Sequence, residues 1–116
     1  MTFHILTIFP DFFRGPLDYG IVERARRAGK LDIHVHDLRN FTHDRHRTVD
    51  DSPYGGGPGM VMRPEPWGEQ LDALLAEGDP MIPRIVVPTP SGTPFSQRLA
   101  EELAEEDWII IACARY

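Results

Sequence analysis

Cysteine is nearly missing from the sequence, and so is any long run of apolar residues. The single cysteine, Cys113, excludes an internal disulfide and is typical of a reducing compartment. No stretch approaches the roughly 18 consecutive apolar residues that a membrane-spanning helix needs. The first ten residues, MTFHILTIFP, lack the basic segment and cleavage site of a signal peptide, so they predict a strand. These absences favour a cytoplasmic protein that is not attached to a membrane.

Basic residues are also scarce, with 12 Lys and Arg against 18 Asp and Glu. The net charge of -6 disfavours indiscriminate binding to nucleic acid. The charge is uneven, however: residues 1–47 carry eight Lys and Arg, six Asp and Glu, and all five histidines. Two interpretations remain open, a surface that meets a polyanion through residues 1–47 or simply two solvated faces.

What the sequence does have is a regular alternation of strand-like and helix-like segments. The composition, 41% hydrophobic and 26% charged, is that of one folded domain. Apolar runs predict strands at 3–9, 31–38 and 108–114, and a short strand from residue 84 into the turn 88–92. Helical spacing predicts helices at 17–29, 64–78 and 96–107. This order predicts an α/β fold with a mostly parallel sheet and flanking helices.

The apolar positions of each expected helix predict its buried face. Cys113, in the last apolar run, is expected to act as a small buried hydrophobe. The residues expected to face inward are Leu17, Ile21, Val22 and Ala25 in the first helix, Trp67, Leu71, Leu74 and Leu75 in the second, and Leu99 and Leu103 in the third.

Two short turns follow the last two expected strands: PTPSG at 88–92 and CARY at 113–116. In parallel sheets, ligands bind beyond the carboxyl ends of the strands. The two prolines of the first turn donate no N–H, which leaves carbonyl groups free to face a ligand such as adenine. A purely structural turn explains the same residues.

The segment 41–62, FTHDRHRTVDDSPYGGGPGMVM, is the least ordinary part of the chain. Arg45 and Arg47 suit contacts to phosphate or bases, and histidine can stack on a base. His43 and His46, with Asp44 or Asp50, offer part of a metal site, but a zinc site wants three or four ligands. A surface loop held by ion pairs remains an equal alternative.

The glycine-rich part of this segment, YGGGPG at 54–59, is suited to holding phosphate through backbone N–H groups. It lacks the GxxxxGK[ST] spacing of a Walker loop and the context of a dinucleotide fingerprint. A tightly turned loop with no ligand is the alternative.

Taken together, these segments resemble one family. IFPDFF, DYGIVERARRAGKL and DLRNFTHDRHRTVDDSPYGGGPGMVM are similar to the N-terminal half of bacterial tRNA (guanine-N1)-methyltransferase, the TrmD family of the SPOUT superfamily. The resemblance covers the whole chain. It implies a trefoil-knot methyltransferase domain that transfers a methyl group from S-adenosylmethionine to the guanosine 3′ of the anticodon.

The resemblance also implies partners and site residues. It implies a homodimer whose active sites form between subunits, and magnesium dependence is a family trait. The residues matching the cofactor site are Val87, Pro88, Thr89, Pro90, Gly92, Ala114, Arg115 and Tyr116. Those matching the tRNA-facing segment are His43, Arg45, His46, Arg47, Asp50, Tyr54, Gly55, Gly56 and Gly57.

Two departures from the family pattern stand out. Ala114 occupies a position where the family usually has glycine, and a methyl group there can crowd the cofactor. The 116 residues end before the rest of the knot and the C-terminal helical domain, and the family's catalytic aspartate and arginine lie beyond Tyr116. We therefore expect residues 1–116 to be the N-terminal part of the domain, truncated before the knot is completed, without catalytic residues and inactive alone. The alternatives are a non-catalytic RNA-binding or dimerisation module, and a nucleotide-binding fold with phosphate on the glycine loop.

Overall fold

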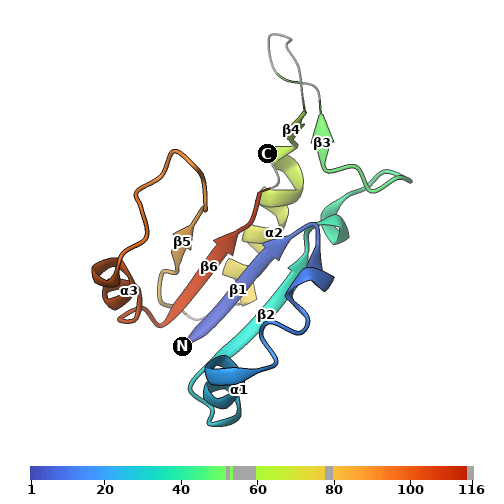
Figure 1. Ribbon diagram of the computed structural model, residues 1–116. Coiled ribbons are helices and arrows are strands. Elements are labelled where there is room, and N and C mark those ends of the chain that lie inside the picture. The colour runs from blue at the N-terminus through green and yellow to red at the C-terminus, as the bar shows by residue number, and fades with distance from the viewer. Residues whose placement is uncertain (52, 54–59, 78–79, 115–116) are drawn as a thin grey trace.

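The four expected strand regions pair into one parallel sheet. The computed structural model describes residues 1–51, 53, 60–77 and 80–114. The sheet order is β2-β1-β6-β5, and every neighbouring pair is parallel (Figure 1). The strands are β1 (Thr2–Thr7), β2 (Asp32–Asp37), β5 (Arg84–Val86) and β6 (Trp108–Ala112). The predicted α/β fold with a parallel sheet and flanking helices is confirmed.

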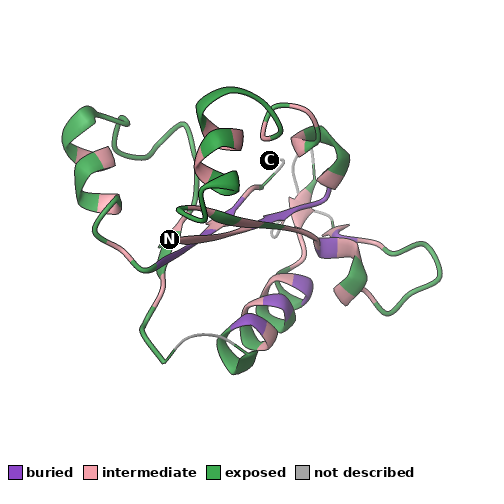
Figure 2. Cartoon of the chain, turned by 90° about the horizontal axis from the view of Figure 1, so that it is seen from below, coloured by how far each residue is buried: buried purple, intermediate pink, exposed green. Residues whose placement is uncertain are grey.

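The helices lie on both faces of this sheet. Right-handed crossovers place α1 (Gly20–Arg27) and α3 (Gln97–Leu103) on one face, since β1 to β2 and β5 to β6 run in the same direction across the sheet. The longer α2 (Pro64–Glu77) covers the opposite face (Figure 2). None of the helices in the described ranges is long and apolar enough to cross a bilayer.

The main core lies between α2 and the sheet. Leu6, Leu74, Trp108 and Ile110 are buried there, and Trp67 and Leu71 pack against them. The indole N–H of Trp108 donates to the carbonyl of Met81 at 2.7 Å, so its one polar group is satisfied. Full burial of each large apolar side chain contributes about 1.5–3 kcal/mol, so this face supplies much of the stability.

A second buried cluster holds the segment after β2. Leu38, in the 3₁₀ turn η2 (Leu38–Phe41), packs with Ile8 and Val49. A second 3₁₀ turn, η1 (Pro10–Phe13), follows β1. The segment expected to be a loop at 41–59 also contains β3 (Asp50–Asp51), which pairs antiparallel with β4 (Val61–Met62).

Some of the predicted inward positions are wrong. The helix α1 begins at Gly20, so Leu17 lies outside it, and Ile21 is 80% exposed. In α2 the buried positions are Pro66, Gln70 and Leu74, while Leu75 is 49% exposed. Leu75 follows Leu74 by 100° around the helix, which turns it away from the sheet.

Other helix boundaries agree more closely with expectation. Gly29 has φ of 73°, and its N–H donates to the carbonyl of Arg26, so it ends α1 as predicted. Ser96 caps α3 by accepting from the N–H of Leu99 at 3.1 Å. This helix ends at Leu103, earlier than the predicted residue 107.

Candidate functional site

The sheet brings the two predicted strand-end turns to the same edge. Neighbouring β5 and β6 are parallel with Val86 opposite Ile111, so Val87 and Pro88 leave the sheet beside the segment that leads to Ala114. Ala114 is exposed. Cys113 is only partly buried, and this burial raises the pKa of its thiol. Arg115 and Tyr116, two further predicted cofactor residues, lie outside the described residues.

The first of these turns is closed by its own hydrogen bonds. The N–H of Gly92 donates to the carbonyl of Thr89 at 3.1 Å. A Cβ on Gly92 would lie 3.3 Å from the methyl carbon of Thr89 and 3.4 Å from its carbonyl oxygen. A side chain at this position would therefore make a tight contact with Thr89. All five predicted residues of this turn are exposed to solvent and accessible to a ligand: Val87, Pro88, Thr89, Pro90 and Gly92.

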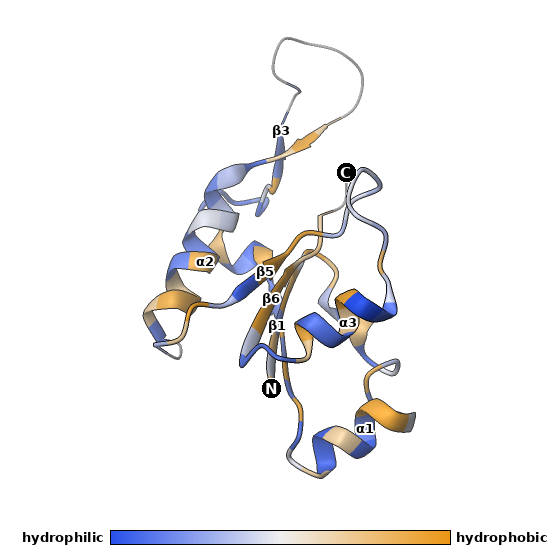
Figure 3. Cartoon of the chain, turned by 90° about the vertical axis from the view of Figure 1, so that its left-hand side faces the viewer, coloured by the Kyte–Doolittle hydropathy of each residue, from blue (hydrophilic) through white to orange (hydrophobic). Residues whose placement is uncertain are grey.

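A cavity of about 620 Å³ adjoins this turn, between α3 and the sheet. Its floor is Phe3, Ile109 and Ile111, and Val87 and Pro88 also line it. Leu99 and Leu103 of α3 face it, as predicted for the inward side of that helix. Figure 3 shows α3 beside the hydrophobic strands β5 and β6. The size and apolar lining are those of a small-molecule site, and sequence reasoning did not identify it.

The predicted tRNA-facing residues lie on a loop that is tied down at several points. His43 contacts both carboxylate oxygens of Glu69 on α2 at 2.9 Å. Asp44 accepts from the backbone N–H of Thr48 at 2.8 Å and from its hydroxyl. These bonds from Thr48 lower the pKa of Asp44. His43 and Asp44 thus hold the loop, and they border a polar depression of about 340 Å³.

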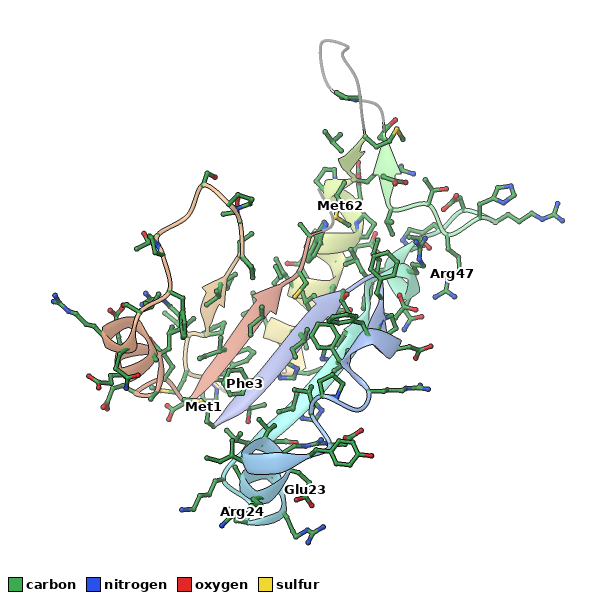
Figure 4. All side chains as sticks on the ribbon, viewed as in Figure 1. Met1, Phe3, Glu23, Arg24, Arg47 and Met62 are labelled. Carbon is green, nitrogen blue, oxygen red and sulfur yellow. The ribbon has the colours of Figure 1, made fainter. Side chains whose placement is uncertain are left out.

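Two arginines close the base of the same loop. Arg39 donates through Nη1 to the carbonyl of Arg47 at 3.0 Å, and Arg47 donates through Nε to the carbonyl of Arg39 at 3.3 Å. Arg47 also donates to the side-chain oxygen of Asn40 at 2.7 Å. Its φ is 53°, the left-handed region that non-glycine residues seldom adopt. We call this pair of reciprocal contacts the Arg39–Arg47 clasp; Arg47 is labelled in Figure 4.

The remaining predicted tRNA-facing residues are exposed, lie in β3, or fall outside the described ranges. Arg45 and His46 are exposed, and neither has a side-chain partner among the described residues. Asp50 lies in β3 opposite Met62. Tyr54, Gly55, Gly56 and Gly57 fall outside the described ranges, as does the rest of the glycine-rich segment.

A cluster of three histidines, which the sequence pattern did not single out, lies on the α2 face of the sheet. His4 of β1 and His34 and His36 of β2 share this face because they alternate with apolar residues and pair in register. Nδ1 of His4 and Nε2 of His36 are 2.8 Å apart, and the His4 ring stacks on His34 at 5.0 Å. Partial burial, then His36 and His34, lowers the pKa of His4 to about 4. In the described part of the chain, no three His, Cys, Asp or Glu side chains are arranged to hold a metal ion.

Comparison with known proteins gives one consistent result. The family model described as tRNA (guanine-1)-methyltransferase TrmD matches residues 1–116. A tRNA (guanine-N(1)-)-methyltransferase from Thermobifida fusca is 59% identical over 116 residues, all of this chain and 44% of that protein. The corresponding protein from Salinispora arenicola is 62% identical over 112 residues, 97% of this chain and 43% of that protein.

A solved structure agrees with these sequence matches. The crystal structure of tRNA (m1G37) methyltransferase from Aquifex aeolicus superimposes with a TM-score of 0.84 at 38% identity. The match covers 97% of this chain and 50% of that one. The chain thus spans less than half the length of the two relatives and half of the solved chain.

Proposed function

The chain belongs to the tRNA (guanine-1)-methyltransferase family TrmD, and we propose that it forms the N-terminal part of an enzyme that methylates N1 of the guanosine 3′ of the anticodon in tRNA. The observation that carries this proposal is the family match over all 116 residues, supported by 59% identity to the Thermobifida fusca protein. We further propose that the rest of a knotted domain and a C-terminal helical domain lie in the part of the relatives that the chain does not match.

The proposed methyl donor is S-adenosylmethionine, which supplies an electrophilic methyl group when it is bound. The strand-end turns fit such a ligand because Val87 and Pro88 are apolar and border the cavity under α3. Pro88 and Pro90 have no N–H, and the carbonyl of Thr89 already accepts from Gly92, so the carbonyls of Pro88 and Pro90 are the ones that we propose for an adenine amino group. We assign the cofactor site to Val87, Pro88, Thr89, Pro90, Gly92, Ala114, Arg115 and Tyr116.

Transfer of a methyl group to guanine N1 needs a base for the N1 proton and a cation near O6. We assign neither role to a residue of this chain and propose that both belong to the part of the relatives beyond the match. We propose that the 43–57 segment contacts tRNA, that a second copy of the chain completes each site, that magnesium takes part, and that the protein acts in the cytoplasm.

The first test joins this chain to the C-terminal part of the Thermobifida fusca relative, in place of that protein's matched residues. S-adenosylhomocysteine is titrated by calorimetry into this chimera and into the 116-residue chain. Binding by the chimera alone, with methylation of a tRNA transcript that has guanosine 3′ of the anticodon, is the expected result. Micromolar binding by the short chain would show that residues 1–116 suffice for the cofactor site, contrary to the expectation that the rest of the domain is needed to complete it. A chimera that binds and methylates nothing would contradict the proposed function.

The second candidate function is a non-catalytic RNA-binding or dimerisation module. The observation that favours it is the exposed pair Arg45 and His46 on a loop tied down at both ends. It predicts that the 116-residue chain binds tRNA without S-adenosylmethionine, with an affinity that falls steeply as salt rises. Salt-independent binding of tRNA, or none, would exclude the RNA-binding form of this candidate.

A further inference from the structure

The loop between η2 and β3 separates its charged residues into two kinds. The guanidinium groups of Arg39 and Arg47 donate hydrogen bonds to oxygens at the base of the loop. Arg45 and His46, in contrast, are exposed at its tip. From this difference we infer that Arg39 and Arg47 are positioning residues, and that Arg45 and His46 form the pair that contacts the RNA. The inference rests on the proposed function, and it divides a segment that the sequence treats as one contact surface.

The clasp uses a property that only arginine has. Arg47 donates from Nε to one oxygen and from Nη2 to another, the carbonyl of Arg39 and the side chain of Asn40. The planar guanidinium presents these donors in a fixed fork, which the single ammonium of lysine cannot reproduce. Arg39 returns a bond to the carbonyl of Arg47, so each arginine fixes the backbone of the other.

The residues around the clasp are anchored as well. Leu38 and Val49, on either side of the loop, are packed in one buried cluster. Asp37 accepts from the N–H of Arg39 at 3.0 Å, and its carboxylate lies 3.8 Å from Arg47. Left-handed backbone is unfavourable for a non-glycine residue such as Arg47, and the clasp contacts offset this cost. The base of the loop is therefore held before any ligand arrives.

The tip has the chemistry that an RNA strand needs. In the turn from Asp44 to Thr48, the carboxylate of Asp44 accepts hydrogen bonds from the N–H and the hydroxyl of Thr48. Arg45 and His46, between these two residues, are left exposed. Two carboxylates of α2 lie beside the loop, and each contacts another residue: Glu69 contacts His43 and Glu65 lies 3.9 Å from Arg63. An unpaired arginine suits bidentate contact with phosphate, and a histidine ring suits stacking on an unpaired base.

Matched lysine and alanine variants distinguish the two roles. In the chimera, binding of the tRNA transcript is measured from low to high salt for Arg45→Lys, Arg45→Ala, Arg47→Lys and Arg47→Ala. A phosphate contact depends on charge, so Arg45→Ala reduces the slope of log K against log salt by about 0.7–0.9 and Arg45→Lys keeps most of it. A clasp residue depends on geometry, so Arg47→Lys lowers affinity as much as Arg47→Ala, about tenfold, with the slope unchanged. Arg98→Ala on α3 is the control and alters neither quantity.

A second measurement needs no RNA. Trypsin cleavage after Arg45 is followed in the 116-residue chain, where Arg47→Lys keeps the number of cleavage sites. We expect cleavage several times faster in Arg47→Lys and in Arg39→Lys, with little further increase in the double variant because the two residues act as a unit. Unchanged cleavage, together with full binding by Arg47→Lys, would overturn the inference. A chimera that binds no tRNA would instead contradict the proposed function, and the cleavage rates would still decide whether the clasp exists.

Discussion

The two faces of the sheet are built for different purposes. On the α2 face, Leu6, Leu74, Trp108 and Ile110 are buried against one another. On the α3 face, a short helix stands over a cavity of about 620 Å³, and Phe95 nearby is 74% exposed. The same strands supply both faces, since their residues alternate between them.

This difference in packing indicates that one face of the sheet contributes mainly to stability and the other to ligand binding. On a closely packed face, removal of a buried atom lowers the free energy of unfolding, because cores have few voids. A face that already borders a cavity loses less, since its side chains have fewer neighbours. We therefore expect the α2 face to govern unfolding, and the α3 face with its strand-end turn to govern the affinity for the proposed cofactor.

The largest expected effect comes from one leucine on each face. Leu74→Ala on α2 removes a buried side chain and is expected to lower the unfolding free energy by about 2–5 kcal/mol. Leu99→Ala on α3 makes the same chemical change beside the cavity and is expected to cost about 1 kcal/mol or less. Urea unfolding of both variants measures the difference.

Equal losses for the two leucine variants would contradict the comparison, because they would mean that the α3 face is packed as tightly as the other. Leu75→Ala serves as the control, since its side chain is about half exposed on the outer side of α2. Its effect should lie within about 0.5 kcal/mol.

The next effect is a dependence of stability on pH that arises on the α2 face. The pKa of His4 is lowered to about 4 in the folded protein from 6.5, and that of His36 is lowered too. The unfolded chain therefore binds more protons between these values, so stability is complete above pH 6.5 and falls as the pH drops towards 4. Because the rings are partly exposed, we expect a loss on the order of 1 kcal/mol.

Several other groups lie close to the histidines that give rise to this pH dependence. Asp32 contacts His34 at 2.9 Å, Glu77 of α2 acts on His36, and the edge of Trp108 faces His4. His4→Asn removes one member of the cluster, so unfolding free energies from pH 7 to 4.5 should fall less steeply than in the parent chain. An unchanged slope would assign the pH dependence to other groups.

The sequence predicted the parts of this fold that depend on local pattern. Gly29 ends α1, Ser96 starts α3 and the predicted strand at 108–114 is observed as β6 (Trp108–Ala112), each for a reason that lies within a few residues. The family was also identified correctly from its motifs. The positions of Ile21 and Leu75 were wrong because helix boundaries and the direction of a buried face depend on partners elsewhere in the chain.

The candidate site was predicted less completely for the same reason. The spacing of Arg45 and Arg47 makes them look alike, and only the fold brings Arg47 to Arg39 and Asn40. The histidine cluster has a weak signal, the alternation in DIHVHD, but the pairing with His4 requires the sheet register. The cavity depends on how far α3 stands from the strands, which no periodicity encodes.

Smaller effects on stability are expected at two glycines, one in the strand-end turn and one in α2. Gly92→Ala brings a Cβ to 3.3 Å from Thr89, so we expect a loss of about 0.5–1 kcal/mol and weaker binding of S-adenosylhomocysteine by the chimera. Gly68→Ala in α2 meets no described atom within 4 Å and should gain about 0.5–1 kcal/mol, since alanine favours a helix interior. Thermal unfolding measures both. A gain at both positions would show that the turn has room to spare.

The smallest expected effect on stability, and the most informative about binding, concerns Ala114. This exposed residue follows β6 at the same edge as Val87, so Ala114→Gly should change the unfolding free energy by less than about 0.5 kcal/mol. If its methyl group crowds the proposed cofactor, the same change should raise the affinity of the chimera for S-adenosylhomocysteine several-fold in calorimetry. Ala28→Gly, at the end of α1, should leave that affinity unchanged. An affinity that falls in Ala114→Gly would mean that the methyl group contacts the ligand favourably, so that alanine at this position supports binding and does not crowd the cofactor.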